Sequence, residues 1–112
     1  KPILEMLADT GADVVEPLDP LGGVDVADAK RRIGQRVALM GGLNTLTLAS
    51  GTPDEVRAEA IRKCREGGPL GYILAAGDMV PPNTPLENLQ AMVDVATKSL
   101  WRDELSQAEE VT

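Results

Sequence analysis

Histidine and phenylalanine are absent from the sequence, and Cys64 is the one cysteine in 112 residues. A single cysteine excludes an internal disulfide and fits a reducing compartment, so we expect a cytoplasmic protein. Without histidine and with one thiol, a zinc site built from this chain alone is not expected, and we predict neither a metal nor another cofactor. The absence of histidine also removes the side chain that most often acts as an acid or base near neutral pH.

Aromatic side chains are scarce as well, because Tyr72 and Trp101 are the only two. A stacking platform for nucleic-acid bases is therefore not expected. The net charge of −7 also argues against nucleic acid and anionic membranes as partners. No apolar run approaches the ~20 residues that span a bilayer. What remains is an ordinary globular composition, with 43% hydrophobic and 26% charged residues, enough for one domain with a modest core.

Strand and helix signals alternate along the chain. Short apolar runs predict three strands, at residues 14–19, 37–40 and 72–76. Pro17 cannot donate a backbone hydrogen bond, so the first strand is expected to end at Glu16. Amphipathic or capped segments predict four helices, at residues 2–10, 25–33, 52–65 and 84–102, with a loop and a helical turn within 43–51. This alternation favours a parallel sheet with right-handed crossovers.

Two helices share the start signal T-P-x-E, at Thr52 and at Thr84. In each, the threonine is expected to be the N-cap, and Glu55 or Glu87 to complete a capping box. The last helix has an apolar stripe that we expect to be buried, formed by Leu86, Leu89, Met92, Val93, Ala96 and Leu100. The two starts are 32 residues apart, a spacing that matches one βα unit of an α/β barrel.

The predicted fold class is α/β, a partial (β/α)8 barrel with about three parallel strands alternating with four helices. Residues 1–102 would form its βα units, and the polar residues 103–112 are expected to fray. Three strands cannot close a barrel, and an open sheet leaves two exposed edges. We therefore expect the chain either to be part of a larger barrel or to self-associate. The first residue is Lys1 and not methionine, so we expect the native N terminus to be missing.

Polar residues follow each predicted strand, where ligands bind in α/β folds. Asp78 is the first charge after the third strand, and Asn44 follows the second. Glu16 and Asp19 are a pair of carboxylates near the end of the first strand, and paired carboxylates can do acid–base work. We predict that Asp78 is catalytic and that the other three bind substrate. The alternatives are turn residues at Asp78 and Asn44, and loop solvation or capping by Glu16 and Asp19.

Four passages resemble the C-terminal portion of the uroporphyrinogen decarboxylase superfamily. They are G-A-D-V-V at residues 11–15, V-A-L-M-G-G-L-N at 37–44, G-T-P-D-E-V at 51–56, and G-Y-I-L-x-x-G at 71–77 followed by T-P-L-E-N-L. Their order and spacing carry the resemblance, which spans residues 2 to about 100. The resemblance implies a (β/α)8 barrel in which residues 1–102 supply the C-terminal βα units, roughly strands six to eight.

The superfamily contains a decarboxylase of haem biosynthesis that needs no metal or cofactor, and methyltransferases linked to cobalamin or thiols that use zinc. By this resemblance, the decarboxylases have a histidine and the zinc methyltransferases a cysteine at the position of Asp78. Here the passage reads Gly77-Asp78-Met79, so both patterns are incomplete at this point. An aspartate can accept hydrogen bonds from pyrrole N–H groups or ligate a metal through oxygen.

The resemblance implies the C-terminal fragment of a decarboxylase-like carboxy-lyase that acts on a tetrapyrrole in porphyrin biosynthesis. The alternatives are a zinc- and cobalamin-type methyltransferase of the same superfamily, and a non-catalytic, self-associating α/β module. The substrate of the whole enzyme would be a small molecule. We expect the 112 residues alone to be inactive, and to associate with another copy or with the N-terminal half of the barrel.

Overall fold

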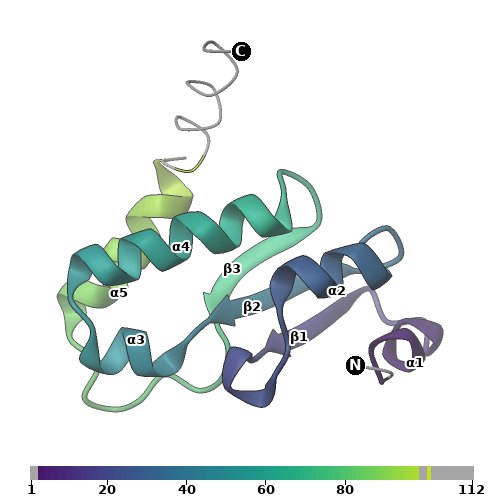
Figure 1. The fold of residues 1–112 in the computed structure, drawn as a ribbon, viewed down its shortest axis with the longest axis horizontal. Helices are drawn as coiled ribbons and strands as arrows, with labels where there is room; N and C mark the ends of the chain where they lie inside the picture. Colours follow the sequence, from purple (N-terminus) through teal and green to yellow (C-terminus); the bar gives the residue numbers. More distant parts are fainter. Residues whose placement is uncertain (1–2, 99–100, 102–112) are drawn as a thin grey trace, which may run out of the picture.

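The computed structural model describes residues 3–98 and residue 101 (Figure 1). Helices and strands alternate along this part of the chain. The strands are β1 (Val14–Leu18), β2 (Ala38–Leu43) and β3 (Tyr72–Ala76). The α-helices are α1 (Ile3–Asp9), α2 (Val26–Ile33), α3 (Thr45–Ser50), α4 (Pro53–Gly67) and α5 (Leu86–Thr97), and a short 3-10 helix, η1, spans Pro20–Gly22. The alternation predicted from the sequence is therefore confirmed.

The three strands form one parallel sheet in the order β1-β2-β3. Each strand therefore lies beside its neighbour in the chain, which confirms the predicted α/β class with parallel strands. The expectation that β1 ends at Glu16 is wrong, because the strand continues through Pro17 to Leu18 with an irregularity in its pairing. The second strand is also longer than predicted, because the glycines after Met40 remain paired with β3 up to Leu43.

Helices cover one face of the sheet. Figure 1 shows α2 and α4 lying across the same face, with α5 beside α4. Side chains that alternate along the strands, such as Val15 and Leu39, are buried beneath these helices. The opposite face is less covered, since Val14 and Ile73 keep 40% and 46% of their surface exposed. The sheet therefore has one packed face and one face that no described helix covers.

The capping box predicted at the start of α4 is confirmed. Thr52 accepts a hydrogen bond from the Glu55 backbone N–H, and Glu55 accepts one from the Thr52 N–H. The matching prediction at α5 is wrong: the N-cap is Pro85, and no side chain caps this helix. The Thr84 hydroxyl instead donates to the Pro81 carbonyl oxygen at 2.8 Å. A turn in the preceding loop therefore occupies the side chain that the sequence assigned to the helix.

The predicted buried stripe of α5 is also wrong in its register. Leu89 and Met92 pack against the hydrophobic cluster, as predicted. Leu86, however, is 79% exposed and Val93 44% exposed, whereas Asn88 is 1% exposed. The Asn88 side-chain amide donates to the carbonyl oxygens of Leu48 and Gly51 at 2.8 and 2.9 Å. These bonds satisfy carbonyls at the end of α3, so a polar residue occupies a position that periodicity would give to an apolar one.

The predicted fraying of residues 103–112 lies outside the described residues, as does the end of the predicted last helix beyond Lys98 apart from Trp101. Within the described residues, no helix combines the length and the apolar character that crossing a membrane would require.

Candidate functional site

The carboxyl ends of the strands surround a hollow of about 450 Å³, which we call the strand-end hollow. Its lining comes from all three strands and from the loop after β3: Glu16, Pro17, Met40, Ala75, Ala76, Asp78, Met79 and Val80. Two of the four predicted site residues, Glu16 and Asp78, therefore lie at the same hollow. Most of the remaining lining is apolar, so two carboxylates face a largely hydrophobic concavity.

A glycine allows the ends of β1 and β3 to approach each other. A Cβ atom on Gly77 would lie 2.8 Å from Pro20 Cδ and 2.9 Å from the Leu18 carbonyl oxygen. These distances are too short for any side chain, so the residue after β3 can contact the end of β1 only if it is glycine. The Gly77 N–H also donates to the Leu43 carbonyl oxygen of β2 at 2.7 Å. The three strand ends thus converge next to Asp78.

Asp78 is exposed, and its Oδ1 atom accepts a hydrogen bond from the Met79 backbone N–H at 2.8 Å. Glu16 is also exposed, on the face of the sheet that the helices leave open. An exposed carboxylate can accept hydrogen bonds from a ligand. The arrangement can therefore hold N–H donors or a cationic group against an apolar floor.

Asn44 caps a helix directly after the end of β2. Its side chain is the N-cap of α3 and accepts a hydrogen bond from the Leu46 N–H at 2.8 Å. Its own backbone N–H donates to Glu59 Oε2 at 2.5 Å. The other carboxylate oxygen of Glu59 accepts from the Thr47 hydroxyl at 2.8 Å. Glu59 is 9% exposed, so a buried carboxylate from α4 fixes the position of Asn44 and of α3.

Sequence reasoning missed Glu59, although a signal was present. Glu59 lies three residues after Val56 and one before Ala60, on the buried side of α4. A carboxylate at such a position needs donors, since a buried charge is costly without them. The nearby strand end, with free backbone N–H groups at the start of α3, supplies those donors.

Asp19 caps η1, where its Oδ1 atom accepts from the Leu21 N–H at 3.0 Å. Neither Asp19 nor Asn44 is among the residues that line the strand-end hollow. The structure thus brings Glu16 and Asp78 together and uses the side chains of Asp19 and Asn44 as caps. The substrate-binding role predicted for these last two stays a prediction.

A tyrosine and a thiol lie beneath the sheet on its covered face. The Tyr72 hydroxyl donates to the Gly41 carbonyl oxygen at 2.5 Å. Burial raises the pKa of Tyr72 well above its usual value, with a smaller contribution from Cys64. Burial also raises the pKa of the Cys64 thiol to about 11, and this residue is 5% exposed. Cys64 is therefore a core residue, and its protonated thiol is a poor nucleophile near neutral pH.

Metal ligands do not gather in the part of the chain that the structure describes: no three His, Cys, Asp or Glu side chains lie close enough to hold an ion together. The strand-end hollow offers only the two carboxylates of Glu16 and Asp78. The described residues at this hollow therefore do not by themselves supply the three protein ligands that a catalytic zinc site needs.

Comparisons with known proteins give consistent matches across the chain. The family model for uroporphyrinogen decarboxylase (URO-D) matches residues 1–99. Uroporphyrinogen decarboxylase 1, chloroplastic, from Oryza sativa subsp. japonica is 38% identical over 108 residues, covering 94% of this chain and 25% of the rice protein. Methylcobamide:CoM methyltransferase MtaA from Methanosarcina barkeri is 38% identical over 92 residues, covering 81% of this chain and 26% of that protein.

A solved structure agrees with these matches. A methyltransferase from Methanosarcina mazei superposes with a TM-score of 0.74 and 33% sequence identity, over 94% of this chain and 28% of that one. The three parallel strands with their helices therefore correspond to part of a (β/α)8 barrel, as predicted. The chain spans about a quarter of the length of the curated relatives that it matches. By the match of the family model over residues 1–99, the chain belongs to the uroporphyrinogen decarboxylase family.

Proposed function

We propose that this chain is the C-terminal part of a uroporphyrinogen decarboxylase-like enzyme, a carboxy-lyase that acts on a tetrapyrrole. The observation that carries the proposal is the strand-end hollow, where Glu16 and Asp78 face an apolar surface formed by Met40, Ala75 and their neighbours. A tetrapyrrole is a large apolar ring with inward N–H groups, which suits this combination. The rest of the site would come from the remaining βα units of the barrel.

The chemistry assigns Asp78 the role of holding the ring. Loss of carbon dioxide from an acetate arm breaks a C–C bond, and a proton then takes the place of the carboxyl group. The reaction is easier when the pyrrole ring is protonated first, because the ring can then accept the electrons of the breaking bond. A carboxylate beside the ring nitrogens stabilises that positive charge and accepts hydrogen bonds from the N–H groups. Glu16, at the same hollow, would bind the ring from β1.

The test is the substitution Asp78→Asn in the full-length protein that carries this chain. The amide would keep the size of the side chain but lose the negative charge, so turnover of a uroporphyrinogen should fall about 100-fold, in the range for one lost electrostatic contact. Asp13→Asn is the matched control, because Asp13 is an exposed aspartate just before β1, at the opposite end of the strands. Unchanged turnover in Asp78→Asn would remove Asp78 from the site.

A methyltransferase is the second candidate, favoured by the similarity to the methyltransferases from Methanosarcina barkeri and Methanosarcina mazei. An aspartate where the resemblance implies a cysteine argues against a zinc site of that kind. Zinc content and methyl transfer to a thiol in the full-length protein distinguish the two enzymes. Stoichiometric zinc together with methyl transfer would replace the decarboxylase proposal.

A self-associating module without catalysis is the third candidate, since β1 and β3 each have a free edge among the described residues. It predicts a defined oligomer of the isolated chain and no activity in any longer form of the protein.

The cytoplasmic location also stays a prediction, and the rice relative is described as chloroplastic.

A further inference from the structure

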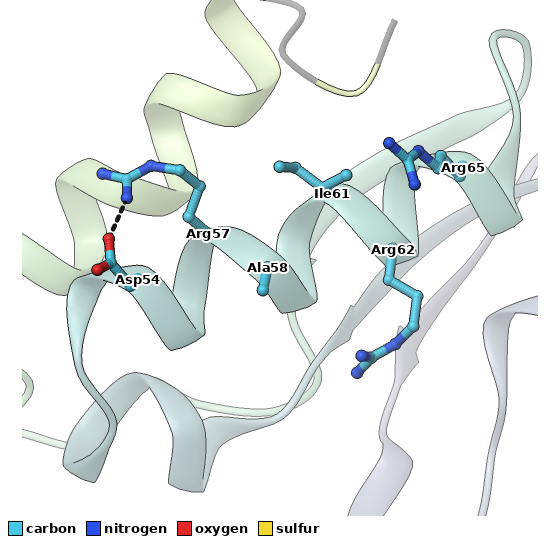
Figure 2. A pocket seen from close by; sticks show the side chains of 6 residues that line it. All are labelled: Asp54, Arg57, Ala58, Ile61, Arg62 and Arg65. Carbon is cyan, nitrogen blue, oxygen red and sulfur yellow. Dashed lines mark hydrogen bonds and ion pairs between the residues drawn. The ribbon is translucent and has the colours of Figure 1, made fainter. Parts of the chain in front are cut away.

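A groove runs along the face of α4 that points away from the sheet (Figure 2). Its volume is about 420 Å³, and its lining follows one side of the helix: Asp54, Arg57, Ala58, Ile61, Arg62 and Arg65. Ala58 and Ile61 form an apolar strip in the middle, and Figure 2 shows the arginines distributed along it. We call this surface the arginine groove. It lies on the far side of α4 from the strand-end hollow and plays no part in the proposed reaction.

The arginine groove is basic in an acidic chain. Three arginines and one aspartate give it a charge of +2, whereas the whole chain carries −7. Arg57 donates to Asp54 at 2.6 Å, but this pair is exposed, with 92% of the Asp54 side chain in solvent. Such a pair contributes little and can rearrange. Arg62 is exposed as well. The groove therefore offers guanidinium groups beside an apolar strip, which suits an acidic peptide with apolar residues.

The chain contains such a peptide in its last ten residues, D-E-L-S-Q-A-E-E-V-T at 103–112. These residues lie outside the described part of the structure. Four of them are acidic, none is basic, and Leu105, Ala108 and Val111 are apolar at a regular spacing of three. Acidic groups can pair with the arginines while the apolar side chains contact Ala58 and Ile61.

The position of Trp101 brings this segment close to the groove. Trp101 lines a small hollow with Cys64 and Gly68, at the C-terminal end of α4, and packs against the hydrophobic cluster there. The groove begins next to this point, at Arg65, and ends at Asp54. The twelve residues of helix from Asp54 to Arg65 span about 18 Å, and ten residues of extended chain reach up to about 33 Å. The segment is thus tethered at one end of the groove and long enough to reach the other.

We propose that the acidic segment 103–112 docks along the arginine groove of α4 in the same molecule. The tether gives the segment a high effective concentration, so weak contacts suffice. The contacts are largely between exposed charges, and salt must weaken them: the Debye length falls from about 8 Å at physiological ionic strength to about 3 Å at 1 M. Docking would cover the outer face of α4 and would prevent acidic segments of other proteins from binding there.

The experiment measures backbone order parameters of residues 104–111 by 15N relaxation in the full 112-residue chain. A docked segment is expected to approach the value of a rigid backbone, about 0.85, at low salt, and to fall below about 0.6 in 1 M salt. The same fall is expected in the groove variant R57Q/R62Q and in the segment variant D103N/E104Q/E109Q/E110Q. The control is R31Q, because Arg31 is an exposed arginine on α2 with a comparable Asp28 partner, and its removal should leave the order parameters unchanged.

Three outcomes overturn the proposal. Order parameters below about 0.6 in the unmodified chain at low salt show a free segment. High order parameters of residues 104–111 that persist in R57Q/R62Q show that the segment binds somewhere other than the arginine groove. Order parameters that fall when the protein is diluted show that the groove binds the segment of a second copy of the chain. Retained order in R57K/R62K, with the amide spectrum of residues 3–98 unchanged in every variant, supports the proposed charge pairing.

Discussion

Glu59 connects the end of β2 to α4, because its carboxylate accepts hydrogen bonds from the Asn44 N–H and the Thr47 hydroxyl. The substitution Glu59→Gln replaces one acceptor oxygen by a donor, which leaves a buried group without its partner. We expect the free energy of unfolding to fall by about 1–3 kcal/mol. Urea denaturation at neutral pH measures this change.

The matched control is Glu87→Gln, because Glu87 is exposed in the first turn of α5 and has no capping role. Its effect should stay within about 0.5 kcal/mol, as for most surface substitutions. Equal stability of the two variants would contradict the role of Glu59 in holding the end of β2.

Cys64 gives a prediction about reactivity. Burial raises the pKa of its thiol from 9.0 to about 11, so at pH 8 the folded chain has about 100-fold less thiolate than an unfolded chain. Since the thiolate is the reactive form, iodoacetamide should alkylate Cys64 at least about 100-fold more slowly in the folded chain than in urea. Mass spectrometry over time measures both rates. A folded chain that reacts as fast as the unfolded one would contradict the burial of this thiol.

At the scale of elements, the approach of β1 to β3 depends on Gly77. The substitution Gly77→Ala would place a methyl group 2.8 Å from Pro20 Cδ and 2.9 Å from the Leu18 carbonyl oxygen. The strand ends must then move apart, and we expect a loss of about 1–3 kcal/mol in the free energy of unfolding. The control is Gly22→Ala in the adjacent η1, where a Cβ would lie 3.8 Å from its nearest neighbour. Thermal or urea unfolding of both variants tests the difference.

The two helix-start signals show when a local sequence pattern is sufficient to predict a helix cap. The T-P-x-E signal at Thr52 produces a capping box, and the identical signal at Thr84 does not. The difference arises before the second signal, where the Pro81 carbonyl oxygen accepts from both the N–H and the hydroxyl of Thr84. The four-residue pattern does not contain this turn, so the pattern predicts a cap that the loop prevents.

Long-range partners explain the other differences. The alternation of apolar runs and helix signals was enough to predict three parallel strands. The strand ends were enough to select Glu16 and Asp78 as candidate site residues, and both line the strand-end hollow, but nothing in the sequence indicated that Asp19 and Asn44 would not. Asn88 and Glu59 were not found, because their partners lie in α3 and its N-cap, outside the local sequence of either residue. Periodicity indicates which side of a helix is buried, but it does not identify the partner that a polar residue on that side requires.

At the scale of the whole molecule, the face of the sheet that no described helix covers, here called the open face, is the surface most suited to association. It exposes Val14, Ile73 and, in the loop after β3, Met79 and Val80, with exposed fractions between 40% and 86%. Exposed apolar surface next to free strand edges favours association. In the proposed enzyme, the remaining βα units of the barrel would cover this face, and in the isolated chain another copy would do so.

The isolated chain is therefore expected to self-associate, and V14T/I73T should reduce its mass in solution, as measured by light scattering across a dilution series. Threonine keeps the β-branched shape that strands favour, and both positions are at least 40% exposed, so the fold should be retained. The control is Leu70→Thr, because Leu70 is 80% exposed in the loop before β3 and lies outside the sheet face. A monomeric unmodified chain, or equal effects of V14T/I73T and Leu70→Thr, would show that the open face does not drive association.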